Sequence, residues 1–184
     1  MSHTERWAEA RASLAGIRLL CLDVDGVLTD GRLRYGSDGE LFKSFHVYDG
    51  LGIKLAMQEG IEVAVITAKT GGPLERRLAD LGIQHAWMGR EDKRTALEEL
   101  RARLGIPSAH IAHVGDDLPD LAVMRNVGLS IAVANATSRV LEEATLVTEK
   151  RGGHGAVREV CERLLTARDR LDPAIEAYLS RHGA

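Results

Sequence analysis

The chain of 184 residues is poor in cysteine, proline and aromatic side chains: it holds two cysteines, four prolines and 4% Phe, Trp and Tyr. Two cysteines cannot build a disulfide framework, and neither Cys21 nor Cys161 has the spacing or the histidine neighbours of a zinc site. Cys21 lies within an apolar run, so we expect it to be a small core residue.

Long hydrophobic runs and a strong charge imbalance are also missing. No stretch reaches the roughly 18 apolar residues of a membrane-spanning helix, and the N-terminal residues MSHTERWAEA lack the apolar centre of a signal peptide. The formal net charge of −3 gives no reason to expect nucleic acid or an anionic membrane as a partner. We therefore expect a cytoplasmic globular protein, with a single domain over residues 1–184.

What the sequence does contain is a regular alternation of apolar runs and amphipathic stretches. Helical patterns such as PLERRLADLG, which starts at Pro73 and ends at a glycine, separate the apolar runs. The alternation predicts an α/β fold, a Rossmann-like parallel sheet with helices on both faces. The expected strands are residues 17–24, 61–67, 84–88, 110–115, 127–133 and 144–148.

Two segments depart from this alternation. Residues 31–47 show period-2 patterning on both sides of GSDG, which predicts a β-hairpin flap directly after the first strand. We find no insertion long enough for a cap domain. The C-terminal tail, residues 150–184, opens with the glycine-rich stretch GGHG, followed by one helix and a second helix that we expect Asp172 to cap.

The first predicted strand ends in two acids, within LLCLDVDGVLTDG. Placing the carboxylates of Asp23 and Asp25 at the end of an apolar strand costs desolvation energy unless a cation lies between them. Two other predicted strands end in Thr67 and in GDDLPD, and Lys93 begins a helix. Because parallel strands bring their carboxyl ends to one rim, we expect these side chains to meet there.

Such a set of groups has a clear chemical use. Two or three carboxylates form the oxygen-rich site that Mg²⁺ prefers. A metal ion, a hydroxyl, a lysine and a spare carboxylate together provide the charge neutralisation, positioning and proton transfer that phosphoryl transfer requires.

In this order the motifs resemble those of the haloacid dehalogenase superfamily of phosphatases, whose first motif is DxDx[TV] and whose last is GDxxxD. From residue 17 to about 166, the chain is similar to the cap-less branch typified by 3-deoxy-D-manno-octulosonate 8-phosphate phosphatase. This closer likeness is carried by DVDGVLTDG, KSFHVYDGLGIK, RRLADLGI, GDDLPDL and GGHGAVRE. The resemblance implies a Mg²⁺-dependent phosphoric monoester hydrolase that forms an aspartyl-phosphate.

The resemblance also implies roles for residues at the matching positions. Asp23 would be the nucleophile, and Asp25 the general acid for the leaving group and then the base for water. Thr67 would bind the phosphoryl oxygens, and Lys93 would steady both Asp23 and the transferring group. The Mg²⁺ ligands would be Asp23, Asp25 through its backbone carbonyl, and Asp116.

The same match places the substrate-binding residues at the mouth of the pocket. The branch usually has Arg where this chain has Tyr48, and SGR where it has TAK, so that Lys69 takes the place of an Arg. The basic residues that remain suggest a second anionic group on the substrate, such as a carboxylate. The expected substrate-binding residues are His46, Val47, Tyr48, Asp49, Gly50, Lys54, Lys69 and Arg77.

Several alternatives stay open at this stage. Asp49 is equally expected to be only the cap of its own helix, and Arg77 to be a solvated helix charge. The first candidate substrate is the phosphorylated sugar acid 3-deoxy-D-manno-octulosonate 8-phosphate, and the alternative is a nonulosonate 9-phosphate or another small phosphate monoester. A receiver-like phospho-acceptor signalling module is an alternative from another class, although receivers lack the DVDG motif on the first strand.

The apolar content of the predicted flap bears on assembly. Its apolar side chains are too many for a solvated two-stranded flap, which would be marginal alone. Since the resembled branch is tetrameric, we expect a homotetramer in which the flaps pack together and GGHGAVRE reaches towards an active site. The side chains concerned are Leu33, Tyr35, Leu41, Phe42, Phe45 and Val47.

Overall fold

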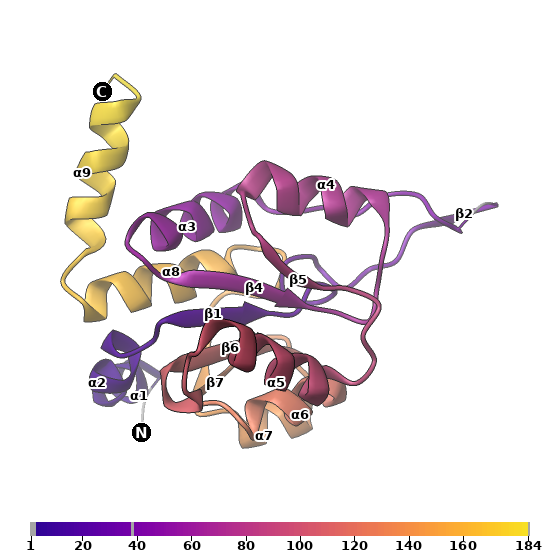
Figure 1. Ribbon diagram of the computed structural model, residues 1–184, viewed down its shortest axis with the longest axis horizontal. Coiled ribbons are helices and arrows are strands. Elements are labelled where there is room, and N and C mark those ends of the chain that lie inside the picture. The colour runs from indigo at the N-terminus through magenta and orange to yellow at the C-terminus, as the bar shows by residue number, and fades with distance from the viewer. Residues whose placement is uncertain (1–2, 38, 184) are drawn as a thin grey trace.

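A computed structural model describes residues 3–37 and 39–183 (Figure 1). Its centre is a six-stranded sheet in the order β5–β4–β1–β6–β7–β8, and all neighbouring strands are parallel. The six predicted strands are thereby confirmed, each within narrower limits. The strands are β1 (Leu19–Leu22), β4 (Glu62–Ile66), β5 (His85–Trp87), β6 (Ile111–Gly115), β7 (Leu129–Ala132) and β8 (Leu146–Val147).

Helices cover both faces of the sheet, as the alternation predicts. Leu19 and Cys21 of β1 belong to an apolar cluster with α5, whereas Leu20 and Leu22 belong to the larger cluster with α3 and α8. Short helices α1 and α2 precede the sheet, and α9 ends the chain (Figure 1). The helices are α1 (His3–Glu9), α2 (Arg11–Ala15), α3 (Val47–Gln58), α4 (Gly72–Leu81), α5 (Lys93–Leu104), α6 (Leu118–Met124), α7 (Ser138–Glu143), α8 (Ala156–Ala167) and α9 (Leu171–Arg181).

The strand order determines where a ligand can enter. From β1 the chain proceeds to β4 and β5 on one side, and then returns past β1 to form β6, β7 and β8 on the other. In such sheets a crevice opens at the carboxyl ends of the two strands between which the direction reverses, here β1 and β6. Asp23 follows β1 and Asp116 follows β6, so the topology brings these two acids together.

The flap is shorter than predicted. Its paired part consists of β2 (Tyr35–Gly36) and β3 (Gly39–Glu40), two residues each, instead of the whole segment 31–47. Asp38, within GSDG, lies outside the described residues. The flap projects beyond the edge where the main strands end (Figure 1), and its side chains Tyr35 and Leu41 are exposed, so longer strands would gain little packing.

Two helices begin earlier than predicted. His46, and not Asp49, is the N-cap of α3, and its Nδ1 accepts a hydrogen bond from the backbone N–H of Tyr48 at 3.3 Å. In the tail, α9 begins at Leu171, so Asp172 lies in the first turn, where a negative charge still favours the helix, and does not cap it. Across residues 3–37 and 39–183, no helix has both the length and the apolar character required to cross a membrane.

Candidate active site

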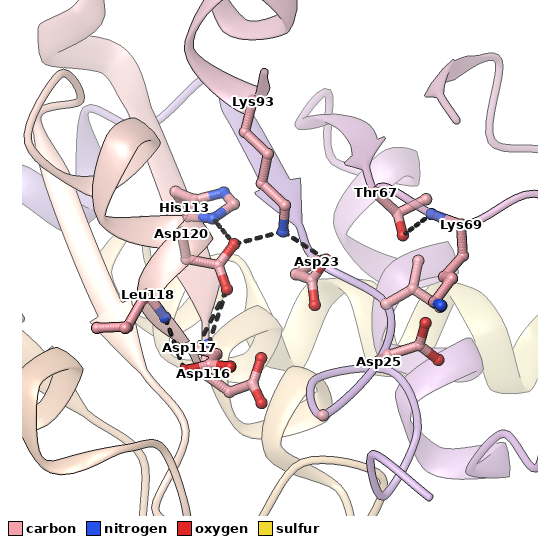
Figure 2. Close-up of polar contacts among 12 residues, drawn as sticks. Asp23, Asp25, Thr67, Lys69, Lys93, His113, Asp116, Asp117, Leu118 and Asp120 are labelled. Carbon is pink, nitrogen blue, oxygen red and sulfur yellow. Dashed lines mark hydrogen bonds and ion pairs between the residues drawn. The ribbon is translucent and has the colours of Figure 1, made fainter. Parts of the chain in front are cut away.

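A buried lysine joins two carboxylates at the carboxyl ends of the central strands. Lys93 Nζ lies 2.7 Å from Asp23 Oδ1 and 2.8 Å from Asp120 Oδ1 (Figure 2). The lysine is fixed at the start of α5 because the Asp92 carboxylate caps that helix and accepts the backbone N–H of Thr95. Burial of a charged amine is tolerated here because both neighbours carry the opposite charge.

The Asp120 carboxylate is fully occupied by partners within the protein. Its Oδ1 also contacts His113 Nε2 at 2.9 Å, and its Oδ2 accepts the backbone N–H groups of Asp116 and Asp117 at 3.1 and 3.4 Å. Burial alone would raise the pKa of Asp120, but its contacts with His113 and Lys93 hold it well below the usual range. Asp120 therefore remains a carboxylate that orients Lys93.

The loop after β1 holds the first two acids in a tight turn. The carbonyl of Val24 accepts backbone hydrogen bonds from Val27, Leu28 and Thr29. Gly26 has a φ of +102°, and a Cβ on it would lie 2.0 Å from Asp116 Oδ2, so only glycine allows this carboxylate to approach the loop.

The glycine-rich tail lies against the same loop. A Cβ on Gly152 would lie 1.6 Å from the carbonyl oxygen of Gly26, and the Gly153 N–H donates to the Val27 carbonyl at 2.9 Å. The tail therefore supports the acidic loop of its own chain through backbone contact. This close contact leaves no room for a side chain at position 152, which explains why the residue there is a glycine.

Asp23 and Asp116 are the carboxylates best suited to hold a cation. Burial, followed by the charge of Asp120, raises the pKa of Asp23 to about 6, although Lys93 opposes this shift. Burial and the charges of Asp23, Asp120 and Asp117 raise the pKa of Asp116 to about 7. Carboxylate oxygens of Asp23, Asp116 and Asp120 lie within 4.8 Å of one another. Since Asp120 and Asp23 share the one ammonium of Lys93, negative charge remains only partly compensated at Asp23 and lacks an ion-pair partner at Asp116 among the described residues. A divalent cation would neutralise this charge.

Asp25 has a different environment. Its Oδ1 lies 2.6 Å from Lys43 Nζ, and this amine also lies 2.9 Å from Glu40 Oε1 in the flap. Its Oδ2 is buried and has no hydrogen-bond partner among the described residues. The sequence analysis did not identify Lys43, because a lysine within a predicted hairpin is usually solvated. Its place in the KSFHVYDG motif was the only signal.

A cavity of about 570 Å³ contains the four predicted catalytic residues and Asp116. Thr67 is buried there, and its hydroxyl accepts the backbone N–H of Lys69 at 3.2 Å. Lys69 also lines the cavity, and its side chain extends towards Asp25 (Figure 2). The sequence analysis did not identify Glu91, which also lines this cavity.

Most of the other predicted substrate-binding residues lie elsewhere. His46 and Tyr48 line a second cavity of about 470 Å³ beside α8, together with His154 and Arg158. Val47 is exposed, as is Lys54 on α3. None of these four is among the residues that line the catalytic cavity in the described part of the chain.

Asp49, Gly50 and Arg77 have structural partners. The buried Asp49 Oδ1 accepts the backbone N–H of Arg158 at 2.8 Å, so it satisfies the first turn of α8 and not that of its own helix. Gly50 lies against Arg77, which donates to the His46 carbonyl at 3.3 Å. Arg77 is therefore not the solvated helix charge that the sequence left open.

Comparisons with known proteins agree with this geometry. Residues 89–160 match the family model of haloacid dehalogenase-like hydrolases. The chain is 48% identical to the 3-deoxy-D-manno-octulosonate 8-phosphate phosphatase of Escherichia coli strain B, over 91% of this chain and 89% of that one. Among solved structures, the Yersinia pestis 3-deoxy-D-manno-octulosonate 8-phosphate phosphatase is 46% identical, with a TM-score of 0.87 and 89% of each chain covered. The Moraxella catarrhalis phosphatase of the same name, solved with a magnesium ion, a phosphate ion and a KDO molecule, is 42% identical, with a TM-score of 0.89 and coverage of 92% of this chain and 98% of that one.

The raised pKa values predict how pH and metal affect stability. In the folded chain, burial and neighbouring charges raise the pKa of Asp23 to about 6 and that of Asp116 to about 7, against an unperturbed pKa of 3.8. At pH values between the unperturbed and the raised pKa, the metal-free folded protein therefore binds more protons than the unfolded chain. Its free energy of unfolding therefore falls as pH rises through this window. At about pH 8, Mg²⁺ at a hundredfold excess over its Kd should raise the free energy of unfolding by about 2.7 kcal/mol and the melting temperature by roughly 5–10 °C. At about pH 5, both increases should be much smaller.

Thermal unfolding with and without Mg²⁺ at the two pH values tests this expectation. Asp116→Asn should make the metal-free protein more stable at high pH and remove most of the response to Mg²⁺. A response to Mg²⁺ that is equal at both pH values would contradict the assignment.

Proposed function

Because this chain belongs to the family of 3-deoxy-D-manno-octulosonate 8-phosphate phosphatases within the haloacid dehalogenase-like hydrolases, we propose that it removes phosphate from this phosphorylated sugar acid. The buried pair of Asp23 and Lys93, in one cavity with Asp25 and Thr67, supports the proposal most strongly. The family membership rules out the receiver-like alternative.

Each step of the hydrolysis can be assigned to a side chain of this cavity. A carboxylate oxygen of Asp23 attacks phosphorus while the bond from phosphorus to the sugar oxygen breaks, and Asp25 gives a proton to that oxygen. Asp25 then takes a proton from the water that hydrolyses the aspartyl-phosphate, which releases phosphate and restores Asp23. Lys93 and the hydroxyl of Thr67 stabilise the charge on the phosphoryl oxygens.

Lys43 fixes the orientation of the Asp25 carboxylate. It holds Oδ1 at 2.6 Å, and the buried Oδ2 has no hydrogen-bond partner among the described residues. Burial would lower the pKa of Lys43, but its contacts with Asp25 and Glu40 raise it, so the amine stays charged.

The donor set fits Mg²⁺. Asp23 and Asp116 would hold the ion with their carboxylates, which lie in one cluster. The family resemblance implies that Asp25 would add its backbone carbonyl. Bound Mg²⁺ neutralises charge on the carboxylates and the phosphoryl group. The raised pKa values of Asp23 and Asp116 support this assignment, because they reflect burial and negative charge without enough positive charge nearby. A bound dication would supply that positive charge and favour the ionised forms of both carboxylates.

Replacement of the nucleophile tests the function directly. With Mg²⁺ and 3-deoxy-D-manno-octulosonate 8-phosphate, Asp23→Asn should lower kcat by at least about 10⁴-fold, since a neutral amide cannot form the covalent intermediate. The Asp25→Asn variant should also release phosphate slowly, but its Asp23 should still become phosphorylated. Asp30→Asn is the matched control, because Asp30 is on the same loop and does not line the cavity. Wild-type rates of phosphate release from the Asp23 variant would refute the mechanism.

Substrate choice should depend on Lys69. The ammonium in the cavity is suited to pair with the carboxylate of a sugar acid, so Lys69→Ala should raise KM for the sugar acid phosphate roughly tenfold or more. KM for glucose 6-phosphate, which has no carboxylate, should change little. Arg76→Ala, an exposed change on α4, is the control.

The same assay decides between the two candidate sugar acids. Because Tyr48 and Lys69 replace the usual arginines, a nonulosonate 9-phosphate remains the second candidate, and the larger kcat/KM identifies the substrate. Equal efficiency on glucose 6-phosphate and on every sugar acid would show that carboxylate recognition is absent.

We also propose a homotetramer, located in the cytoplasm. The flap exposes apolar side chains that a neighbouring subunit could cover, including Tyr35 and Leu41, each 62% exposed. A neighbour at this edge would also close the catalytic cavity and bring its surface to the exposed Val47 and Tyr48. Both cysteines are buried free thiols, which suits a reducing compartment.

Light scattering at micromolar concentration tests the assembly. Four chains of 20.0 kDa should give a mass of about 80 kDa. The double variant Tyr35→Ser, Leu41→Ser should lower this mass, whereas Leu179→Ser, on the exposed side of α9, should not. A monomeric wild-type protein would contradict the proposal.

A further inference from the structure

His113 is a polar residue in the most buried part of the sheet. It lies in the centre of β6, next to Cys21 of β1 and Ser130 of β7, and its exposed fraction is 0%. Its chain neighbours Ala112 and Val114 are apolar core residues. Burial of an imidazole among such residues costs free energy unless its ring nitrogens find partners, so the contacts of the ring need an explanation.

The imidazole is the first member of a buried chain of polar contacts that ends at the nucleophile. His113 Nε2 lies 2.9 Å from Asp120 Oδ1, which lies 2.8 Å from Lys93 Nζ. Lys93 Nζ in turn lies 2.7 Å from Asp23 Oδ1 (Figure 2). All four side chains are buried, and those of His113 and Asp120 are the most deeply buried, which strengthens the contact between them.

The partners of the ring determine its tautomer. An ionised Asp120 can only accept, so His113 Nε2 carries the proton and donates it. His113 Nδ1 is buried without a hydrogen-bond partner among the described residues, and a proton there would be an unpaired buried donor. The ring therefore supplies a directed hydrogen bond from Nε2 to Asp120, while Lys93 contacts both Asp23 and Asp120.

We propose that His113 is a positioning residue for phosphoryl transfer, which holds Asp120 so that Lys93 stays in contact with Asp23. Backbone N–H groups hold only Oδ2 of Asp120, and the contacts of its Oδ1 are His113 and the flexible Lys93 side chain. Without the imidazole, Oδ1 can move and draw the ammonium away from the nucleophile. This inference rests on the proposed function, because it concerns the same reaction.

Three variants separate a positioning role from simple burial. In His113→Gln the side-chain N–H can reach the position of Nε2, in His113→Asn it falls short, and in His113→Leu it is missing. We expect kcat to fall roughly tenfold or more in the Leu and Asn variants with KM within about twofold, and the Gln variant to stay within about threefold of wild type. If the Leu variant fails to fold, the contrast between Gln and Asn, both polar amides, still decides.

Ser130→Ala is the matched control, a loss of a buried polar group on the neighbouring strand that is bonded to Thr145 and not to the catalytic chain. It should lower the melting temperature without changing kcat. Equal kcat values for the Gln and Asn variants would overturn the proposal.

Two readouts keep this inference separate from the proposed substrate. The kcat defect should be similar with 3-deoxy-D-manno-octulosonate 8-phosphate and with a generic aryl phosphate, and an enzyme active only on the aryl phosphate would refute the substrate alone. Independently of activity, nuclear magnetic resonance of ¹⁵N-labelled protein should show a slowly exchanging Lys93 ammonium signal in the wild type and the Gln variant. The signal should be lost in the Asn variant, and its persistence there would overturn the positioning role.

Discussion

The contact of buried Lys93 with Asp23 and Asp120 is the interaction on which the rest of the structure depends. Three elements meet there: β1 leads to Asp23, α5 begins with Lys93, and α6 contains Asp120. Removal of one partner from a buried ion pair typically costs about 3–5 kcal/mol, because the remaining charge is left unpaired in the interior. The charge cluster therefore depends on the order of the sheet, in which β1 and β6 are neighbours, just as the apolar core does.

The cluster is balanced only in part, and this imbalance links stability to chemistry. Lys93 compensates Asp120 and part of the charge on Asp23, whereas Asp116 has no lysine or arginine in an ion pair among the described residues. The resulting rise in the pKa of Asp116 to about 7 is a folding cost that a cation would remove. A site held in this state is preorganised for a metal ion, because the ion would bring the positive charge that Asp23 and Asp116 lack.

The sequence was informative where one local pattern determined the outcome. All six strands, and the position of Asp23, Thr67, Lys93 and Asp116 in one cavity, followed from apolar periodicity and from the rule that parallel strands end at one rim. Other residues depend on contacts between distant segments. Asp49 binds the backbone of α8, 109 positions away, and Lys43 reaches back to Asp25 from the flap. His113 has the sequence environment of an ordinary strand residue. Only the fold reveals that its ring faces Asp120.

The loop after β1 connects assembly with catalysis. The tail supports it at Gly26 through Gly152, and the flap reaches it through Lys43, which holds the acid–base residue Asp25. The tail is anchored in the core by α8, whereas the flap is a two-stranded segment of marginal stability alone. If neighbouring subunits cover the flap, as proposed above, they fix Lys43 and with it the orientation of Asp25. Burial of apolar side chains between subunits would then stabilise the contact of Lys43 with Asp25.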